Sequence, residues 1–482
     1  MNEQVTDVVE DVERRDYWLD EFEVPPGLMP DPQFNELKAQ IQVHRVRPKY
    51  ANDKSPSEPP PAVVLIHGRT VPGPVAFDLR DPPGVTAPGG GPLKLSVQEA
   101  LAWAGIDTFA PSLLGYGKST RFDKGLDDPG NASLPSDRTL IPGINPLDQQ
   151  GRMLLVNPLA GQKRAHSSTY RFARTDVWVR DIDQVINFAI DQTNDAYSDS
   201  PGPPQREVAL VGYSLGGQHV GRMLYARNPL GGHQLEPRGR IIEKVSRVVF
   251  VNSLFVAEGP TEDPELGLPT FPLTLNDRSG SDVIWRMSGE LLGCEATCSG
   301  HIIPGTQEQV WCQTMEQETL GRGWGGDDPN YPTGLNRAPT FSGYGWNREV
   351  AGRLRKPTLV MQSLEDTVLP TGPATGRAIY DALYQALPPA AMPNKVLVQV
   401  QCASHALLWE GCAGARCTPP PETPETTPYG DPPWGRAAPW AGPHATFKAA
   451  LIEWITGDRP TFNGNENGSF IVGESGVARA AS

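Results

Sequence analysis

The stretch Glu207-Val-Ala-Leu-Val-Gly-Tyr-Ser-Leu-Gly-Gly217 joins an apolar run to the pattern Gly-x-Ser-x-Gly around Ser214. The residues that follow, QHVGRMLYARN, suit a helix. In such a strand-turn-helix unit the serine occupies a sharp, strained turn, and small flanking residues allow close packing there. The turn exposes the serine hydroxyl at the carboxyl edge of a sheet, which predicts a nucleophile. The alternative is a serine that only caps the following helix.

Other segments alternate in character along the chain. The expected strands are Lys38–Val46 at a sheet edge, the buried runs Ala62–Ile66, Ile106–Pro111, Ser246–Phe255 and Pro357–Ser363, and Lys395–Gln401 as the last strand. The expected helices are Leu95–Ala104, Val177–Thr193 and a closing helix at His444–Ile455. Because strands alternate with helices, the fold class is α/β with a mostly parallel, doubly wound sheet.

Composition excludes some classes of partner. The 42 Lys and Arg residues against 56 Asp and Glu residues give a formal net charge of −14, and nucleic-acid binding needs a basic face. Apolar runs such as Ala62–Ile66 are far too short to cross a membrane. The acidic N-terminus has no apolar signal region, so a cytoplasmic location is expected. Secretion after removal of an upstream signal is the alternative.

The chain divides into a core and insertions. Residues 1–36 are expected to form an N-terminal arm on the surface, and residues 37–255 and 349–482 a core that carries a Pro-rich insert at 411–443. Residues 256–348 interrupt the alternation, and structureless loops of that length are rare, so they are expected to form a lid that controls substrate size. The lid tryptophans could line an apolar or aromatic pocket or could pack within the lid: Trp285, Trp311, Trp324 and Trp346.

A nucleophilic serine needs a base and an acid that orients the base. Among eight histidines, His405 directly follows the last expected strand, at the sheet edge where Ser214 should emerge. The loop after Pro357–Ser363 offers Asp366, which is preferred, and Glu365, whose ordinary role would be a solvated loop charge. Glu258 is a weaker third candidate for the acid.

The six cysteines allow several interpretations. Cys294, Cys298 and Cys312 with His301 match a zinc site only weakly, and no metal or cofactor is expected. An even number in Gly/Pro-rich loops suits disulfides in an oxidising compartment, and reduced thiols in a cytosolic enzyme are equally compatible with the sequence. Cys412 and Cys417, in the loop GCAGARC, are expected to be able to bridge.

The motifs AVVLIHG, LGYGKS, VGYSLGG, PTLVMQSLEDTVLP and CASHALLWE resemble those of the α/β-hydrolase superfamily over residues 38–255 and 349–456. The order Ser214, Asp366, His405 is the order of that topology. The resemblance implies an oxyanion hole formed by the N–H groups of Leu215 and Arg69, with Thr70 as second choice for Arg69. Ser363 departs from the pattern, since a glycine often stands there.

A serine at this turn excludes the relatives that use aspartate, such as haloalkane dehalogenases and epoxide hydrolases. The expected function is hydrolysis of a small-molecule carboxylic ester or lactone through an acyl-enzyme, with Ser214 as nucleophile, His405 as base and Asp366 as orienting acid. Acyl transfer, amide or peptide hydrolysis and carbon–carbon bond hydrolysis are alternatives on the same triad. A more remote alternative is a non-catalytic relative that binds a ligand. A homodimer is compatible with the sequence.

Overall fold

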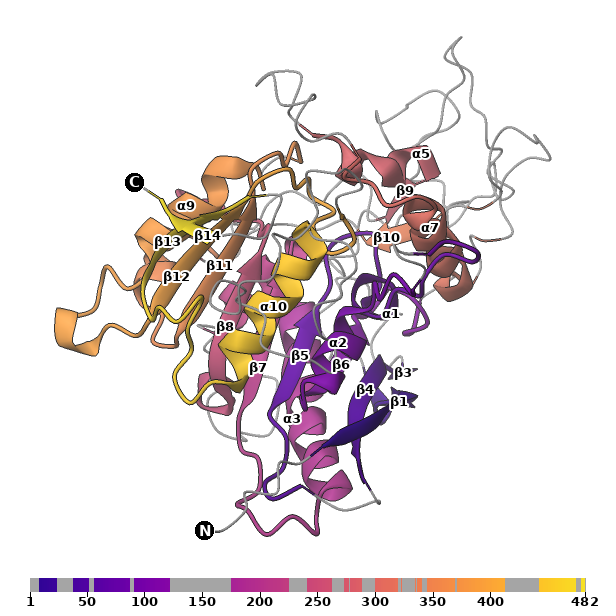
Figure 1. Ribbon diagram of the computed structural model, residues 1–482, viewed down its shortest axis with the longest axis horizontal. Helices are drawn as coiled ribbons and strands as arrows, with labels where there is room; N and C mark the ends of the chain where they lie inside the picture. Colours follow the sequence, from indigo (N-terminus) through magenta and orange to yellow (C-terminus); the bar gives the residue numbers. More distant parts are fainter. Residues whose placement is uncertain are drawn as a thin grey trace.

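A ten-stranded sheet with the order β1-β4-β6-β5-β7-β8-β11-β12-β13-β14 organises the described part of the chain (Figure 1). The computed structural model describes residues 8–23, 38–51, 56–86, 91–121, 175–224, 241–261, 273–276, 278–287, 300–319, 322, 334, 336–339, 345–368, 371–411, 442–473 and 478–481. The strands from β6 to β13 run parallel, whereas β1, β4 and β14 are antiparallel to their neighbours. This confirms the α/β class with a mostly parallel sheet.

At the centre of the sheet the strand bounds lie within about one residue of the expected apolar runs, except that the strand expected at Ser246–Phe255 ends at Val251. The strands of the sheet are β1 (Val9–Trp18), β4 (Gln42–Tyr50), β5 (Ala62–Ile66), β6 (Asp107–Ser112), β7 (Val208–Tyr213), β8 (Val245–Val251), β11 (Thr358–Ser363), β12 (Lys395–Val400), β13 (Gly468–Val472) and β14 (Ala478–Ala480). Two further sheets have two short strands each. One pairs β2 (Phe22–Glu23) with β3 (Lys38–Ala39), and the other pairs β9 (Leu273–Asn276) with β10 (Asn336–Pro339).

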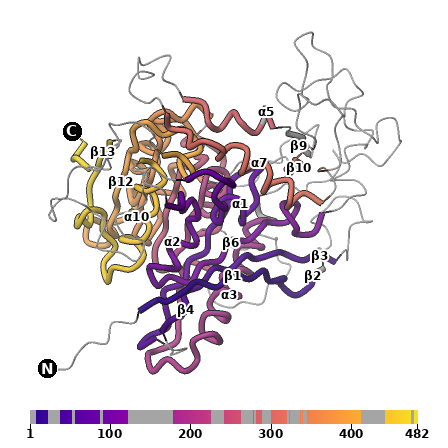
Figure 2. The backbone as a smooth tube through the Cα atoms, turned by 45° about the vertical axis from the view of Figure 1, so that its right-hand side comes forward, coloured from indigo at the N-terminus to yellow at the C-terminus, as the bar shows by residue number. Residues whose placement is uncertain are grey.

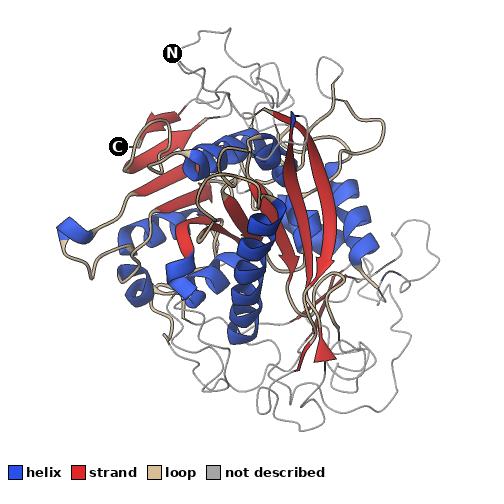
Figure 3. Cartoon of the chain, turned by 90° about the horizontal axis from the view of Figure 1, so that it is seen from below, coloured by secondary structure: helices blue, strands red, loops and turns tan. Residues whose placement is uncertain are grey.

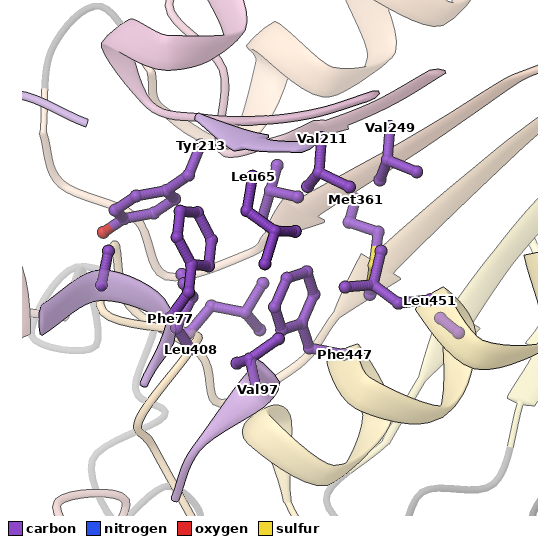
Figure 4. Close-up of a cluster of buried hydrophobic side chains, with 14 of the residues drawn as sticks. Leu65, Phe77, Val97, Val211, Tyr213, Val249, Met361, Leu408, Phe447 and Leu451 are labelled. Atoms are coloured by element: carbon purple, nitrogen blue, oxygen red, sulfur yellow. The ribbon is translucent and has the colours of Figure 1, made fainter. Parts of the chain in front are cut away.

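Helices cover both faces of the sheet (Figure 3). One face packs against α3 (Thr175–Ala196), α4 (Leu215–Met223), α8 (Arg348–Gly352) and α9 (Pro373–Ala382). The other packs against α1 (Gly73–Phe77), α2 (Val97–Trp103) and α10 (Pro443–Thr456). Successive residues of a strand point to opposite faces of the sheet, so Val64 of β5 packs in the first cluster and Leu65 in the second. Figure 4 shows the second cluster, where Leu65 and Val211 of the sheet face Phe447 of α10.

Both edges of the sheet differ from expectation. The segment Lys38–Val46, expected to be one edge strand, contains β3 and the first part of β4. Strand β4 is not at the edge, because it pairs with both β1 and β6. Strand β1 comes from the expected surface arm, and β13 and β14 extend the sheet beyond the strand that was expected to be last. The sequence VEDVERRDYW gave no sign of β1 because an edge strand that is mostly half-exposed or exposed needs no apolar period. It is held partly by charge, since Arg47 pairs with Glu13 at 2.6 Å.

A charged cluster attaches β1 to the core. His44 of β4 contacts Asp16 of β1 through Nδ1 at 2.7 Å and Asp78, at the end of α1, through Nε2 at 2.9 Å. Arg14 of β1 also reaches Asp78, at 2.9 Å. Burial alone would lower the pKa of His44, but its bonds with the two carboxylates outweigh burial and raise the pKa to about 9.

This shift predicts a pH-dependent stability. A histidine whose pKa is higher in the folded state contributes stability that is complete below about pH 6.5 and is lost as pH rises through 9. Between pH 7 and 10 we expect the free energy of unfolding to fall by about 1–3 kcal/mol more in the wild type than in His44→Gln. Urea unfolding at several pH values measures this difference. Parallel pH curves for the two proteins would show that His44 is not the responsible group.

The expected lid region contains α5 (Arg278–Ser281), the 3₁₀ turn η5 (Asp282–Trp285), α7 (Thr306–Gln317) and the β9–β10 pair. Figures 1 and 2 show α5, α7, β9 and β10 together beyond one end of the sheet. Helix α7 lies against α1, and the side-chain amide of Gln313 donates to the Asp78 carbonyl at 3.0 Å. Trp346 is buried in the main core and stacks on Phe250 of β8, with ring centroids 4.6 Å apart, which agrees with the packing alternative. Trp324 lies outside the described residues.

Two further 3₁₀ turns, η4 (Ile241–Lys244) and η7 (Pro389–Ala391), complete the described elements. Most of the Pro-rich insert at 411–443 lies outside the described residues. No helix in the described ranges has the length and apolar character that a membrane span requires.

Candidate active site

Ser214 lies at the junction of β7 and α4 with φ 55° and ψ −121°, a backbone conformation that costs free energy in any residue but glycine. The surrounding backbone holds the turn in place. The Ser214 N–H donates to the Val251 carbonyl at 2.9 Å, and the Ser214 carbonyl accepts from Leu254 at 3.0 Å. The Ser214 side chain makes no capping bond to α4, so the capping alternative is wrong.

The loop after β5 passes directly beside the serine. A Cβ atom on Gly68 would lie 2.9 Å from the Ser214 Cβ, and one on Gly216 would lie 2.4 Å from the Ile66 carbonyl oxygen. Both positions therefore need glycine for close approach of the two loops. The backbone that should supply the oxyanion donors is thus brought to Ser214, with Leu215 next to the serine and Arg69 next to Gly68. Which N–H groups bind an oxyanion stays a prediction.

His405 links the serine to the acid. Its Nε2 lies 2.9 Å from Ser214 Oγ, and its Nδ1 lies 2.8 Å from Asp366 Oδ2. All three side chains are buried, with Ser214 8% exposed. Since an ionised carboxylate only accepts hydrogen bonds, Nδ1 carries the proton and Nε2 is free to accept the serine proton. The structure therefore brings together the three residues that the sequence selected.

The acid is oriented by two neighbours that sequence reasoning missed. Asp366 Oδ1 accepts from the Val368 N–H at 2.8 Å, and Oδ2 accepts from the Thr371 hydroxyl at 3.0 Å. The Thr371 hydroxyl also lies 3.2 Å from His405 Nδ1. These bonds fix the plane of the carboxylate against the imidazole. The only signal in the sequence was a hydroxyl residue five positions after the acid.

Two side chains from the sheet hold the backbone of the histidine. The carbonyl of His405 accepts from the Tyr213 hydroxyl at 2.7 Å and from Asn252 Nδ2 at 3.3 Å. Burial raises the pKa of Tyr213 well above its ordinary value, which keeps the hydroxyl protonated as the donor. Asn252 also bonds the Ser363 hydroxyl at 2.9 Å, and its Oδ1 accepts the Ser363 N–H at 2.8 Å. The serine that departs from the family pattern thus ties the acid strand to the histidine loop.

The two competing acids lie in different surroundings. Glu258 is on the surface, where its side chain is 83% exposed and pairs with Arg348 at 3.1 Å. Glu365 was expected to face solvent or a neighbouring loop, and the solvated alternative is wrong, because the residue is only 5% exposed. Its N–H donates to the Ala403 carbonyl at 3.0 Å, so the two loops are paired here and cover the side chain.

Two other histidines, His67 and His219, are buried near the site. His67 contacts the Gly68 carbonyl through Nδ1 at 2.7 Å and accepts the Leu113 N–H at Nε2. Burial lowers the pKa of His67 to about 4, so it is neutral. His219 of α4 is buried against Trp178, with ring centroids 4.7 Å apart, and burial lowers its pKa to about 3. His166 and His233 lie outside the described residues.

The cysteines are seen only in part. Cys402 forms a disulfide whose partner is outside the described residues, whereas Cys312 is free and exposed. The other four cysteines lie outside the described residues: Cys294, Cys298, Cys412 and Cys417. The expected Cys412–Cys417 bridge and half of the weakly matching zinc set therefore also lie outside the described residues.

Comparisons with known proteins complete the description of the site. Neither the models of known protein families nor the curated proteins give a match to this chain. Solved structures do resemble it. A bromoperoxidase from Bacillus anthracis is 16% identical with a TM-score of 0.34, covering 77% of this chain and 90% of its own.

A thioesterase domain from the curacin biosynthetic pathway is 13% identical with a TM-score of 0.36, covering 82% of this chain and 95% of its own. A monoacylglycerol lipase from Paleococcus ferrophilus is 14% identical with a TM-score of 0.35, covering 83% and 96%. The sheet order, the strained serine turn and the order of Ser214, Asp366 and His405 along the chain agree with the α/β-hydrolase fold that the sequence motifs predicted.

Proposed function

We propose that the protein is a serine hydrolase that cleaves a small-molecule carboxylic ester or lactone through an acyl-enzyme. The observation that carries the proposal is the continuous chain of hydrogen bonds from Ser214 Oγ through the His405 ring to Asp366, with lengths of 2.9 and 2.8 Å. A buried serine, histidine and aspartate at these distances have the geometry of an activated nucleophile.

The proposed proton transfers follow the two hydrogen bonds of His405. Ser214 Oγ attacks the substrate carbonyl carbon while its proton passes to His405 Nε2. The ring becomes a cation whose Nδ1–H is held by Asp366, and the developing oxyanion takes the Leu215 N–H and, as expected from the sequence, the Arg69 N–H. The proton then passes from Nε2 to the leaving alkoxide. In deacylation, His405 Nε2 takes a proton from water as the water oxygen attacks the acyl carbon, and that proton then passes to Ser214 Oγ as the acyl–Oγ bond breaks and the acid leaves.

A fluorophosphonate probe tests the proposal directly. The probe reacts with an activated serine, so it should label the wild type and leave Ser214→Ala unlabelled. A panel of aryl esters, lactones and amides then ranks the substrate classes, and esters or lactones should be turned over fastest. Preferred amide turnover would favour the amidase alternative. Faster product formation with an added alcohol or amine than with water would favour acyl transfer. An unlabelled wild type would instead favour a ligand-binding protein.

A further inference from the structure

The short segment Asp282–Met287, within the expected lid, contacts the loop that carries the acid. Met287 forms an isolated antiparallel bridge with Asp366 itself. Beside it, the Thr367 hydroxyl donates to the Arg286 carbonyl at 3.2 Å. The insertion is therefore bonded to the backbone around Asp366.

The same segment also contacts both neighbours of His405. The Ile284 carbonyl accepts from the Ser404 hydroxyl at 2.9 Å and from the Ala406 N–H at 3.1 Å. Next to it, Trp285 is 3% exposed and packs on Trp409, with ring centroids 5.7 Å apart. One segment of six residues thus joins the acid loop to the histidine loop.

Glu410 connects these contacts from within the histidine loop. The side chain is fully buried, its Oε2 accepts the Ser404 N–H at 2.8 Å, and its Oε1 contacts the Ser404 hydroxyl. The hydroxyl has one proton, and the Ile284 carbonyl can only accept it. Glu410 satisfies both bonds at once if its Oε1 carries a proton and donates to Ser404 Oγ. Burial, with a smaller effect of the Asp366 charge, raises the pKa of Glu410 to about 8, which agrees with this neutral form.

We propose that Ser404 and Glu410 are positioning residues for His405, and that they attach the segment Asp282–Met287 to the catalytic site as a part of its framework. The proposal rests on the proposed function for its kinetic consequences. It changes the interpretation of the insertion: this part should stay in place while substrate enters. Control of substrate size by 256–348 stays a prediction, but replacing the whole segment should also disturb His405 and Asp366.

Paired substitutions at Glu410 test the proposal. Glutamine offers one acceptor and one donor, as the neutral acid does, so Glu410→Gln should keep kcat within about threefold of wild type. Glu410→Ala removes both bonds to Ser404 and should lower kcat about 10- to 100-fold with KM within about twofold, because misplacement of a catalytic group by about 1 Å can cost 10²-fold. Leu101→Ala, in the core at α2, is the control for general destabilisation, and its kcat should be unchanged.

Several results would overturn the proposal. One is a kcat of Glu410→Gln that is as low as the kcat of Glu410→Ala. Another is a kcat of Glu410→Ala that is no lower than that of Leu101→Ala when the two variants have lost the same amount of Tm. If Glu410→Ala does not fold, Ser404→Ala decides, and a normal kcat there contradicts the positioning role. Amide hydrogen exchange gives a readout that needs no activity: segments 282–287 and 403–410 should both exchange faster in Glu410→Ala. Unchanged exchange in 282–287 overturns the attachment even if the wild type proves to be no hydrolase.

Discussion

Replacing Ser214 or His405 by alanine should lower kcat for the best aryl ester by about 10⁴–10⁶-fold, because the two side chains act as one unit. Ser214 at its ordinary acidity is a weak nucleophile, and the 2.9 Å bond to His405 Nε2 provides the route for its proton. Without either partner, what remains is the catalysis due to substrate binding and the oxyanion donors.

The double variant gives the sharper result. Since each single change already disables the unit, Ser214→Ala with His405→Ala should be no more than about threefold slower than the worse single variant. Rates that multiply would mean that the two residues act independently, contrary to the proposed mechanism. His67→Ala is not a suitable control because His67 lies beside the serine loop, whereas His44→Gln, in the β1 cluster, should leave kcat unchanged.

Asp366→Asn should lower kcat by about 10²–10⁴-fold with the fold intact. The carboxylate accepts the proton on His405 Nδ1 at 2.8 Å, whereas an asparagine can present its NH₂ group there and favour the wrong tautomer. In the serine-protease triad the equivalent change lowers kcat by about 10⁴-fold. Steady-state kinetics, with circular dichroism to check folding, measure the loss.

The matched comparison is Glu365→Gln, one residue away. Glu365 is buried, so this change can cost stability, whereas both ring nitrogens of His405 already have partners in Asp366 and Ser214. We therefore expect a kcat within about tenfold of wild type, since a substitution away from the reacting atoms changes folding more than chemistry. Glu258→Gln, on the surface, should be neutral. If one of the glutamate variants loses most of its kcat while Asp366→Asn loses little, the acid is misassigned. The assignment of Ser214 and His405 would not be affected by that result.

The centre of the sheet and the triad could be predicted from local sequence. Strands buried on both faces need continuous apolar runs, and β5 (Ala62–Ile66) begins and ends at the predicted residues. The carboxyl ends of parallel strands meet at one edge, so residues after three such strands had to lie close together. For this reason Ser214, Asp366 and His405 could be selected from their positions alone.

The edges of the sheet and the supports of the triad were decided by tertiary structure. Strand β1 has no apolar period because it needs only one neighbour and a few charge pairs to stay attached. Asn252 and Ile284 contact the histidine loop from far away in the chain, and Glu410 bonds the Ser404 N–H within that loop. Each contact uses a backbone carbonyl or N–H group, which leaves no signature in the sequence. The sequence alone determined which side chains meet at the candidate site, because strand patterns order them along one edge. Which neighbours hold them in place depended on how loops far apart in the chain pack, and that is set by contacts no local pattern encodes.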